Sequence, residues 1–384
     1  MMTEGPLATF TLDLDILRGM LGLDEESTPR AVVRAARAVA PGFAAVALSV
    51  AAAEGHTLGS GSQDEVRRAR DRIAYYEQVA ARAARSATAR IVKGPALARR
   101  YPSPLVRSMC DLDLLVPDEA ALWRVVREVA AAHTPDLLHV SLLTRGTDRD
   151  LVATLCWPAP DPLLDPDHKI EVATVVHAGD LERIPVRRGA PADPAVADLL
   201  ALAEERFQHP FGVKDAIDVA VLLGSPRAPQ PAAVVAAARA YLLAPELLEL
   251  VDYACSHPGL LSAPSPRLME PLRAAARAET ARRATTPARP ATPVNSPVNA
   301  ADGDVRQRMA QGLPVHGLYL RAVHGTDQAD QLVSRIEDFA SGVLLRSPVA
   351  DFLLVGRERV DQRLYQAALK ALEPSAGEPA GLSW

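Results

Sequence analysis

The chain has 384 residues, which is enough for two or three domains with sizeable cores. Apolar residues make up 48% and charged residues 23%, as in globular proteins, and the net charge of −5 argues against nucleic-acid binding over the whole surface. No apolar run reaches the roughly 20 residues that cross a bilayer, and the N-terminus lacks the basic segment of a secretory signal. The three cysteines have neither metal-ligand spacing nor the pattern of a disulfide framework, so we expect a cytoplasmic protein with no membrane partner.

The apolar periodicity predicts an α+β protein in which helical regions flank a small mixed β-sheet. Residues 1–62 form an Ala-rich N-terminal helical region, and Ser62 with the two acids that follow it predicts a helix from about 64 to 85. The core at 63–185 contains an amphipathic helix at 118–133. Its β-prone runs lie at 89–92, 111–116, 137–143, 151–157 and 169–176.

Three further segments follow this core. Helical patterns return in a domain at 186–278. A Pro/Thr/Ala-rich linker is expected at 279–304, where little apolar content is available for folding. Residues 305–384 regain periodicity, and we expect them to form a C-terminal α/β segment that packs on the rest.

Positive charge gathers between residues 67 and 107, which contain eleven Arg and Lys residues and only two acids, Asp71 and Glu77. One interpretation is the solvated face of a helix. The other is an electrostatic field that attracts a polyanion, in which case RNA or a peptide is the possible partner.

Two aspartates open the predicted strand at 111–116. Side chains alternate along a strand, so Asp111 and Asp113 point the same way. Two carboxylates held side by side repel each other, and a bound cation would explain the arrangement. If the strand at 169–176 lies beside this one, Glu171 adds a third carboxylate, and the three could bind one or two Mg²⁺ or Mn²⁺ ions. A solvent-facing edge strand is the alternative interpretation of the pair.

Basic residues just before the pair suit a phosphorylated ligand. Gly94 allows close approach of the backbone to a phosphate, while Lys93 and Arg107 can neutralise its oxygens. Other polar residues in this region are weaker candidates. Asp165 and Asp167 are alternatives to the third carboxylate, and His168, His177 and His209 are possible but isolated site residues.

The segment VKGPALARRYPSPLVRSMCDLDLLVPD, residues 92–118, resembles the uncharacterised nucleotidyltransferase family of the polymerase-β-like superfamily. That family's motif runs Leu-Lys-Gly, a helix, and then Arg-x-x-x-Asp-x-Asp-Leu-Leu-Val. The matching residues here are Lys93, Gly94, Arg107, Asp111, Asp113, Leu114, Leu115 and Val116. The segment GVKDAIDVAVLL at 212–223 is also similar to a Lys-Asp-x-x-Asp helix of related enzymes, with Lys214 and Asp218 one turn apart.

The resemblance implies a nucleotidyltransferase core that uses Mg²⁺ or Mn²⁺ and an NTP, with ATP as the expected substrate. It assigns Asp111, Asp113 and Glu171 as catalytic and metal-binding residues. It assigns Lys93, Gly94, Arg107, Lys214 and Asp218 to nucleotide binding. The sequence departs from the pattern in two places: Lys-Gly stands where most of the superfamily has Gly-Ser, and Ala173 stands where the family often has His.

The implied reaction transfers NMP from the NTP to a hydroxyl acceptor. The acceptor is open between a small molecule, a peptide or protein, and the end of a tRNA. The two departures leave an alternative function, a catalytically inactive nucleotidyltransferase-fold binding protein in a biosynthetic or toxin–antitoxin system.

Overall fold

The computed structural model describes residues 8–40, 42–107, 109–180, 183–286, 305–323, 332–339, 342–356 and 360–373. Within these ranges the chain is a mixed α/β protein built on a nine-stranded sheet with the order β1-β2-β5-β4-β3-β6-β9-β8-β7. The strand pairs are antiparallel except for β2 and β5, which run parallel. The mixed α/β character expected from the sequence is confirmed, and the sheet is larger than expected.

The first five strands correspond to the five β-prone runs of the sequence. They are β1 (Arg90–Val92), β2 (Asp111–Leu115), β3 (Leu137–Arg145), β4 (Asp148–Trp157) and β5 (His168–Ala173). Burial alternates along β2 and β5, as period-2 sequences require, so each strand has one buried and one half-exposed face. The register pairs Asp111 with Lys169 and Asp113 with Glu171.

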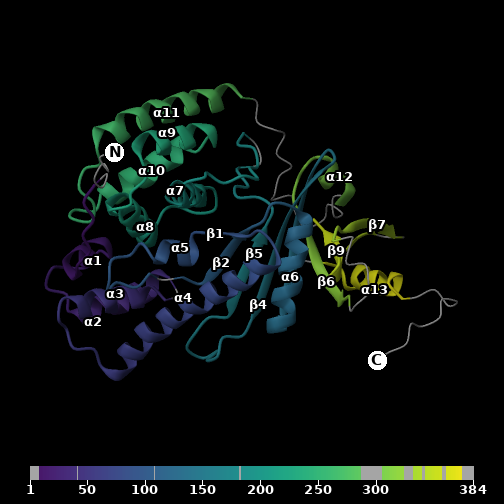
Figure 1. Cartoon of the computed structure of the whole chain (residues 1–384), viewed down its shortest axis with the longest axis horizontal. Helices are drawn as coiled ribbons and strands as arrows, with labels where there is room; N and C mark the ends of the chain where they lie inside the picture. Colours follow the sequence, from purple (N-terminus) through teal and green to yellow (C-terminus); the bar gives the residue numbers. More distant parts are fainter. Residues whose placement is uncertain are drawn as a thin grey trace.

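Two helices, α4 (Ser60–Ser86) and α6 (Glu119–His133), cover the buried face of this part of the sheet (Figure 1). Helix α6 begins where the sequence predicts, because the Asp118 side chain caps it by accepting a hydrogen bond of 2.8 Å from the Ala121 N–H. Its Trp123 is fully buried in the core beneath the strands. The apolar residues between the aspartates, Leu112 and Leu114, point into the same core.

The N-terminal helices and the helices after the sheet share one apolar core, although more than 100 residues separate them in the sequence. The N-terminal group is α1 (Leu14–Met20), α2 (Pro29–Val39) and α3 (Phe43–Ala53). The later group is α7 (Pro194–Glu204), η1 (Glu205–Phe207), α8 (Val213–Gly224), α9 (Pro231–Ala240), α10 (Ala244–Cys255) and α11 (Pro266–Thr285). The short helix α5 (Gly94–Ala98) joins this core through Leu97.

The C-terminal segment continues the sheet, because β6 pairs with β3 through Ser141 and His316. This segment comprises α12 (Val305–Ala310), β6 (Val315–Ala322), β7 (Arg335–Phe339), β8 (Gly342–Arg346), β9 (Ala350–Val355) and α13 (Gln362–Ala371). Helix α11 extends into the predicted linker as far as Thr285, and residues 287–304 of that linker lie outside the described ranges. No described helix combines the length and apolar character needed to cross a membrane.

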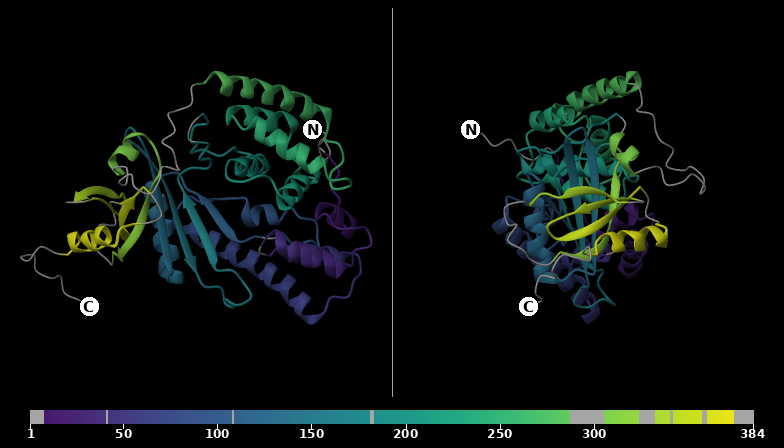
Figure 2. Two further views of the ribbon diagram at one scale, coloured as in Figure 1. Left: turned by 180° about the vertical axis from the view of Figure 1, so that it is seen from behind. Right: turned by 90° about the vertical axis from the view of Figure 1, so that its right-hand side faces the viewer.

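The half-exposed face of β4 and β5 looks toward the viewer in the left view of Figure 2. Helices α7–α11 stand to one side of this face, and the C-terminal strands stand to the other. The side chains of Asp111 and Asp113 on β2 and of Glu171 on β5 lie on this half-exposed side of the sheet.

Candidate functional site

The carboxylates singled out in the sequence, Asp111, Asp113 and Glu171, lie on neighbouring strands and are called the carboxylate cluster below. Because β2 and β5 are parallel and in register, Glu171 stands directly beside Asp113 on the same face. The Asp111 side chain is 43% exposed and that of Glu171 is 34% exposed, so a ligand can reach both. The strands that carry these carboxylates are therefore neighbours, as expected from the sequence.

A fourth residue of this cluster, Lys169, did not emerge from the sequence analysis. Its Nζ lies 2.6 Å from Oε1 of Glu171 and 3.7 Å from Oδ2 of Asp111. The sequence did contain a signal for it, since a residue two positions before Glu171 on a strand must share its face. Burial alone would lower the pKa of Lys169, but its hydrogen bond and charge pairing with Glu171 raise the pKa overall.

The cluster perturbs the carboxyl group at its centre. Removal from water raises the pKa of Asp113, and repulsion from Asp111 and Glu171 raises it further. The nearby Lys93 ammonium lowers it only in part, and the result is a pKa of about 7. Three like charges gathered at one place are typical of a site that receives a cation.

A strained turn leads from β1 into α5 beside this cluster. Val92 pairs with Asp113, so Lys93 follows directly at the edge of the carboxylates. Lys93 has φ 55° and ψ −129°, and Gly94 has φ 46°. Glycine adopts the Lys93 conformation far more easily than a residue with a side chain, so the turn holds Lys93 in a strained backbone conformation.

Two acids of the later helices hold Lys93 in this turn. Its backbone N–H donates to Oδ1 of Asp198 at 2.9 Å, and its Nζ donates to Oε1 of Glu205 at 2.5 Å. Burial alone would lower the pKa of Lys93, but the carboxylates of Glu205 and Asp113 raise it. Lys93 therefore stays protonated, with its charge between Glu205 and the carboxylate cluster.

Arg107 and Asp218 form a buried ion pair beneath this turn. The Arg107 Nε and Nη2 atoms donate to the two carboxylate oxygens of Asp218, each at 2.8 Å, and the Tyr101 hydroxyl donates to Asp218 at 2.6 Å. The side chains are 4% and 0% exposed. Arg107 Nη1 also donates to the Gly94 carbonyl at 3.4 Å, so the ion pair supports the turn. A direct contact of Arg107 or Asp218 with nucleotide stays a prediction.

Lys214 lies at the border of this pair and is more accessible. Its side chain is 31% exposed, and its Nζ is 4.0 Å from Oδ2 of Asp218. The one-turn spacing of these residues on α8 is present as the sequence predicts.

Among the other sequence candidates, four side chains have partners within the chain: Asp165, His168, His177 and His209. Asp165 forms an ion pair of 2.5 Å with Arg68, which fixes the β4–β5 loop against α4. His168 is buried on the opposite face of β5, where its ring lies 4.2 Å from that of Tyr75. His177 contacts Glu204 at 2.6 Å, and His209 is 3.8 Å from Glu205.

Several arginines of the basic stretch also bind groups of the chain itself. Arg67 pairs with Asp64 and Asp71. Arg72 donates to the backbone carbonyls of Cys110, Pro166 and Asp167. These contacts give the arginines structural roles, and the RNA or peptide partner stays a prediction.

No group of three or more His, Cys, Asp or Glu side chains in the described ranges is arranged to hold a metal ion. The donors nevertheless suit a hard cation, because Asp111, Asp113 and Glu171 supply only carboxylate oxygens, the ligands preferred by Mg²⁺. Burial raises the pKa of Asp113, and repulsion from Asp111 and Glu171 adds to the rise. Lys169 now neutralises part of this charge, so its ammonium would have to move for a metal to bind.

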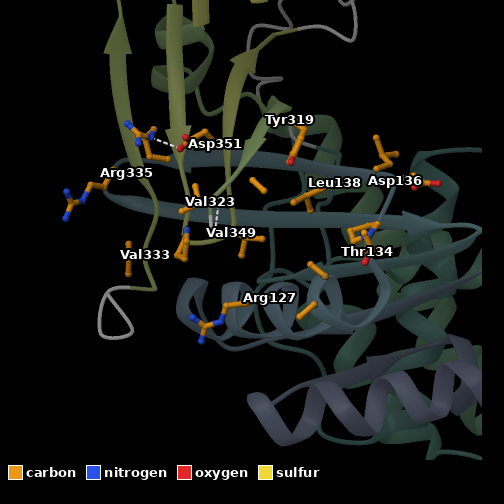
Figure 3. Close-up of a pocket in the computed structure, with 18 of the residues that line it drawn as sticks. Arg127, Thr134, Asp136, Leu138, Tyr319, Val323, Val333, Arg335, Val349 and Asp351 are labelled. Atoms are coloured by element: carbon orange, nitrogen blue, oxygen red, sulfur yellow. Dashed lines mark hydrogen bonds and ion pairs between the residues drawn. The ribbon is translucent and has the colours of Figure 1, made fainter. Parts of the chain in front are cut away.

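A separate cavity of about 860 Å³ lies between the end of α6, the start of β3 and the C-terminal strands (Figure 3). Large apolar side chains are unusually exposed around it: Leu137 is 51%, Val333 54%, Tyr319 41% and Val323 38% exposed. Of the described residues that line it, none belongs to the carboxylate cluster.

Comparison with protein-family models, curated proteins and solved structures finds no match to this chain.

Proposed function

We propose that the protein is a nucleotidyltransferase that moves NMP from an NTP, with ATP as the expected donor, to a hydroxyl acceptor. The observation that carries the proposal is the register of β2 and β5, which places three carboxylates on one accessible face beside the Lys93–Gly94 turn. This arrangement agrees with the resemblance of residues 92–118 to a nucleotidyltransferase motif.

Asp111, Asp113 and Glu171 would hold Mg²⁺ or Mn²⁺. The metal would supply positive charge for the triphosphate oxygens and for the leaving pyrophosphate. Lys93 and Lys214 would add positive charge along the triphosphate, since Lys93 is close enough to the cluster to interact with Asp113 and Lys214 is partly exposed beside Asp218. Arg107 and Asp218 would act beneath them as positioning residues that fix the Gly94 backbone.

In the reaction, the acceptor oxygen forms a bond to the α-phosphorus while the bond between that phosphorus and the bridging oxygen to the β-phosphate breaks. Pyrophosphate leaves with the electron pair of that bond. The acceptor proton would pass to a carboxylate oxygen of Glu171, which is 34% exposed on the open face of the sheet. Ala173 has no ionisable side chain, so it cannot take this role.

A second candidate function is an inactive binding protein of the same fold. Lys169 favours it, because an ammonium already neutralises Asp111 and Glu171. Such a protein would bind NTP without releasing pyrophosphate.

The test is incubation of the protein with each α-phosphate-labelled NTP, Mg²⁺ or Mn²⁺, and a host lysate separated into RNA, protein and small molecules. We expect label in one fraction, and its loss in the Asp111→Asn/Asp113→Asn variant. The Glu25→Gln/Glu26→Gln variant, which removes two exposed charges between α1 and α2, serves as control. NTP binding with no label in any fraction and no pyrophosphate release would support the binding protein instead.

A further inference from the structure

Lys169 forms ion pairs with two members of the carboxylate cluster. It stands on β5 opposite Asp111, two residues before Glu171, and its side chain shares their face. One ammonium group thereby contacts both strands of the parallel pair, at 2.6 Å from Glu171 and 3.7 Å from Asp111.

The other two lysines of the region pair with different acids. Lys93 Nζ lies 2.5 Å from Glu205, and Lys214 Nζ lies 4.0 Å from Asp218. Glu205 and Asp218 both belong to the helices after the sheet rather than to the cluster itself. Among these described ion pairs, the one cation that bridges two cluster carboxylates is Lys169.

The Lys169 side chain is also able to move away from Asp111 and Glu171. It is 40% exposed, and four flexible methylene groups carry the ammonium. An accessible ion pair of this kind contributes little net stability, so a divalent cation can displace it at modest cost.

We propose that Lys169 is an internal counter-ion, which holds Asp111 and Glu171 in position in the metal-free protein and turns to the triphosphate when metal and NTP bind together. This inference rests on the proposed function, since it assumes that the cluster binds a metal. Lys169 is then a positioning residue in the free protein and a nucleotide ligand in the complex.

Two consequences follow from competition between the ammonium and the metal. The metal alone should bind weakly, because it must expel Lys169 with no new partner for that charge. NTP should strengthen metal binding, because the triphosphate offers the displaced ammonium a new anionic partner. Metal and nucleotide are therefore expected to bind cooperatively.

The test is titration of the full chain with Mn²⁺, first without nucleotide and then with ATP against an ATP-only reference, followed by electron paramagnetic resonance of the free ion. Lys169→Met keeps the stem and removes the charge, so it should tighten Mn²⁺ binding about tenfold and reduce the enhancement of that binding by ATP. Lys169→Arg keeps the charge and should bind Mn²⁺ as weakly as the wild type. Lys370→Met, which removes an exposed charge on α13, should leave the Mn²⁺ affinity unchanged, and circular dichroism checks that each variant is folded.

The outcomes separate this inference from the proposed function. Equal Mn²⁺ affinity of the wild type and Lys169→Met, with loss of binding in Asp111→Asn/Asp113→Asn, would overturn the counter-ion role and leave the metal site intact. Equal and weak binding of Mn²⁺ by all these proteins, the double aspartate variant included, would overturn both the inference and the proposed metal site. Tighter binding by Lys169→Met but not by Lys169→Arg would support both.

Discussion

The buried ion pair of Arg107 and Asp218 should be among the most sensitive positions near the site. Asp218→Asn keeps the shape of the side chain and removes its charge. In the wild type, the Asp218 carboxylate accepts two hydrogen bonds of 2.8 Å from Arg107 and one of 2.6 Å from Tyr101. Although burial alone would raise it, the Arg107 guanidinium holds the pKa of Asp218 below its ordinary value.

The expected cost follows from the burial of the remaining charge. With Arg107 4% exposed and Asp218 fully buried, the substitution leaves a guanidinium with no anion and little water. Breaking a buried ion pair in this way costs about 3–5 kcal/mol, which is a large part of the roughly 5–15 kcal/mol that stabilises a typical protein. Replacing both partners with apolar residues, as in Arg107→Met/Asp218→Leu, removes the unpaired charge and should cost less than either single change.

Urea unfolding followed by circular dichroism measures these free energies, and the wild type, Arg107→Met, Asp218→Leu and the double variant complete a mutant cycle. We expect a coupling of about 2 kcal/mol or more between the two positions. Single changes that each cost under about 1 kcal/mol and add in the double variant would refute a buried, mutually dependent pair.

Three other positions give independent predictions. Because φ at residue 93 is positive, the free energy of unfolding of Lys93→Gly should exceed that of Lys93→Ala by about 1–2 kcal/mol in urea titrations. Both variants lose the ion pair to Glu205, and equal stability would contradict the strained turn. Burial lowers the pKa of His168 from 6.5 to about 4, so the unfolded chain binds a proton first as the pH falls. Wild-type stability should therefore drop by up to about 3 kcal/mol between pH 6.5 and 4, and His168→Phe should lack that part of the loss in acid titrations of thermal unfolding. Lys214→Met should raise the Kd for ATP about tenfold in calorimetry. It should change the free energy of unfolding by less than about 0.5 kcal/mol, because Lys214 Nζ lies as far as 4.0 Å from Asp218. A large loss of stability would instead give Lys214 a structural role.

The local parts of the fold were predictable from the sequence because their patterns are local. Alternating apolar residues located β2 and β5, and the Asp118 cap located the start of α6. The shared face of Asp111 and Asp113 followed from the two-residue period of a strand. The same two-residue period places Lys169 on the face of Glu171, although a motif made of carboxylates does not include it.

Long-range partners were not predictable, because no local pattern records them. Arg107 and Asp218 are 111 residues apart, so a motif that placed both near nucleotide could not reveal that they neutralise each other. Arg68 and Asp165 are 97 residues apart, and their pairing gave both a structural role. The continuation of the sheet through β6 likewise depends on pairing with β3 across more than 170 residues.

Anomalous diffraction from crystals soaked with Mn²⁺ and a non-hydrolysable ATP analogue would locate the metal, the nucleotide and the Lys169 side chain together. We expect a manganese peak between Asp111, Asp113 and Glu171, with the Lys169 ammonium moved from Glu171 toward the triphosphate. Nucleotide bound elsewhere, with Lys169 still paired to Glu171 and no manganese at the three carboxylates, would contradict this expectation.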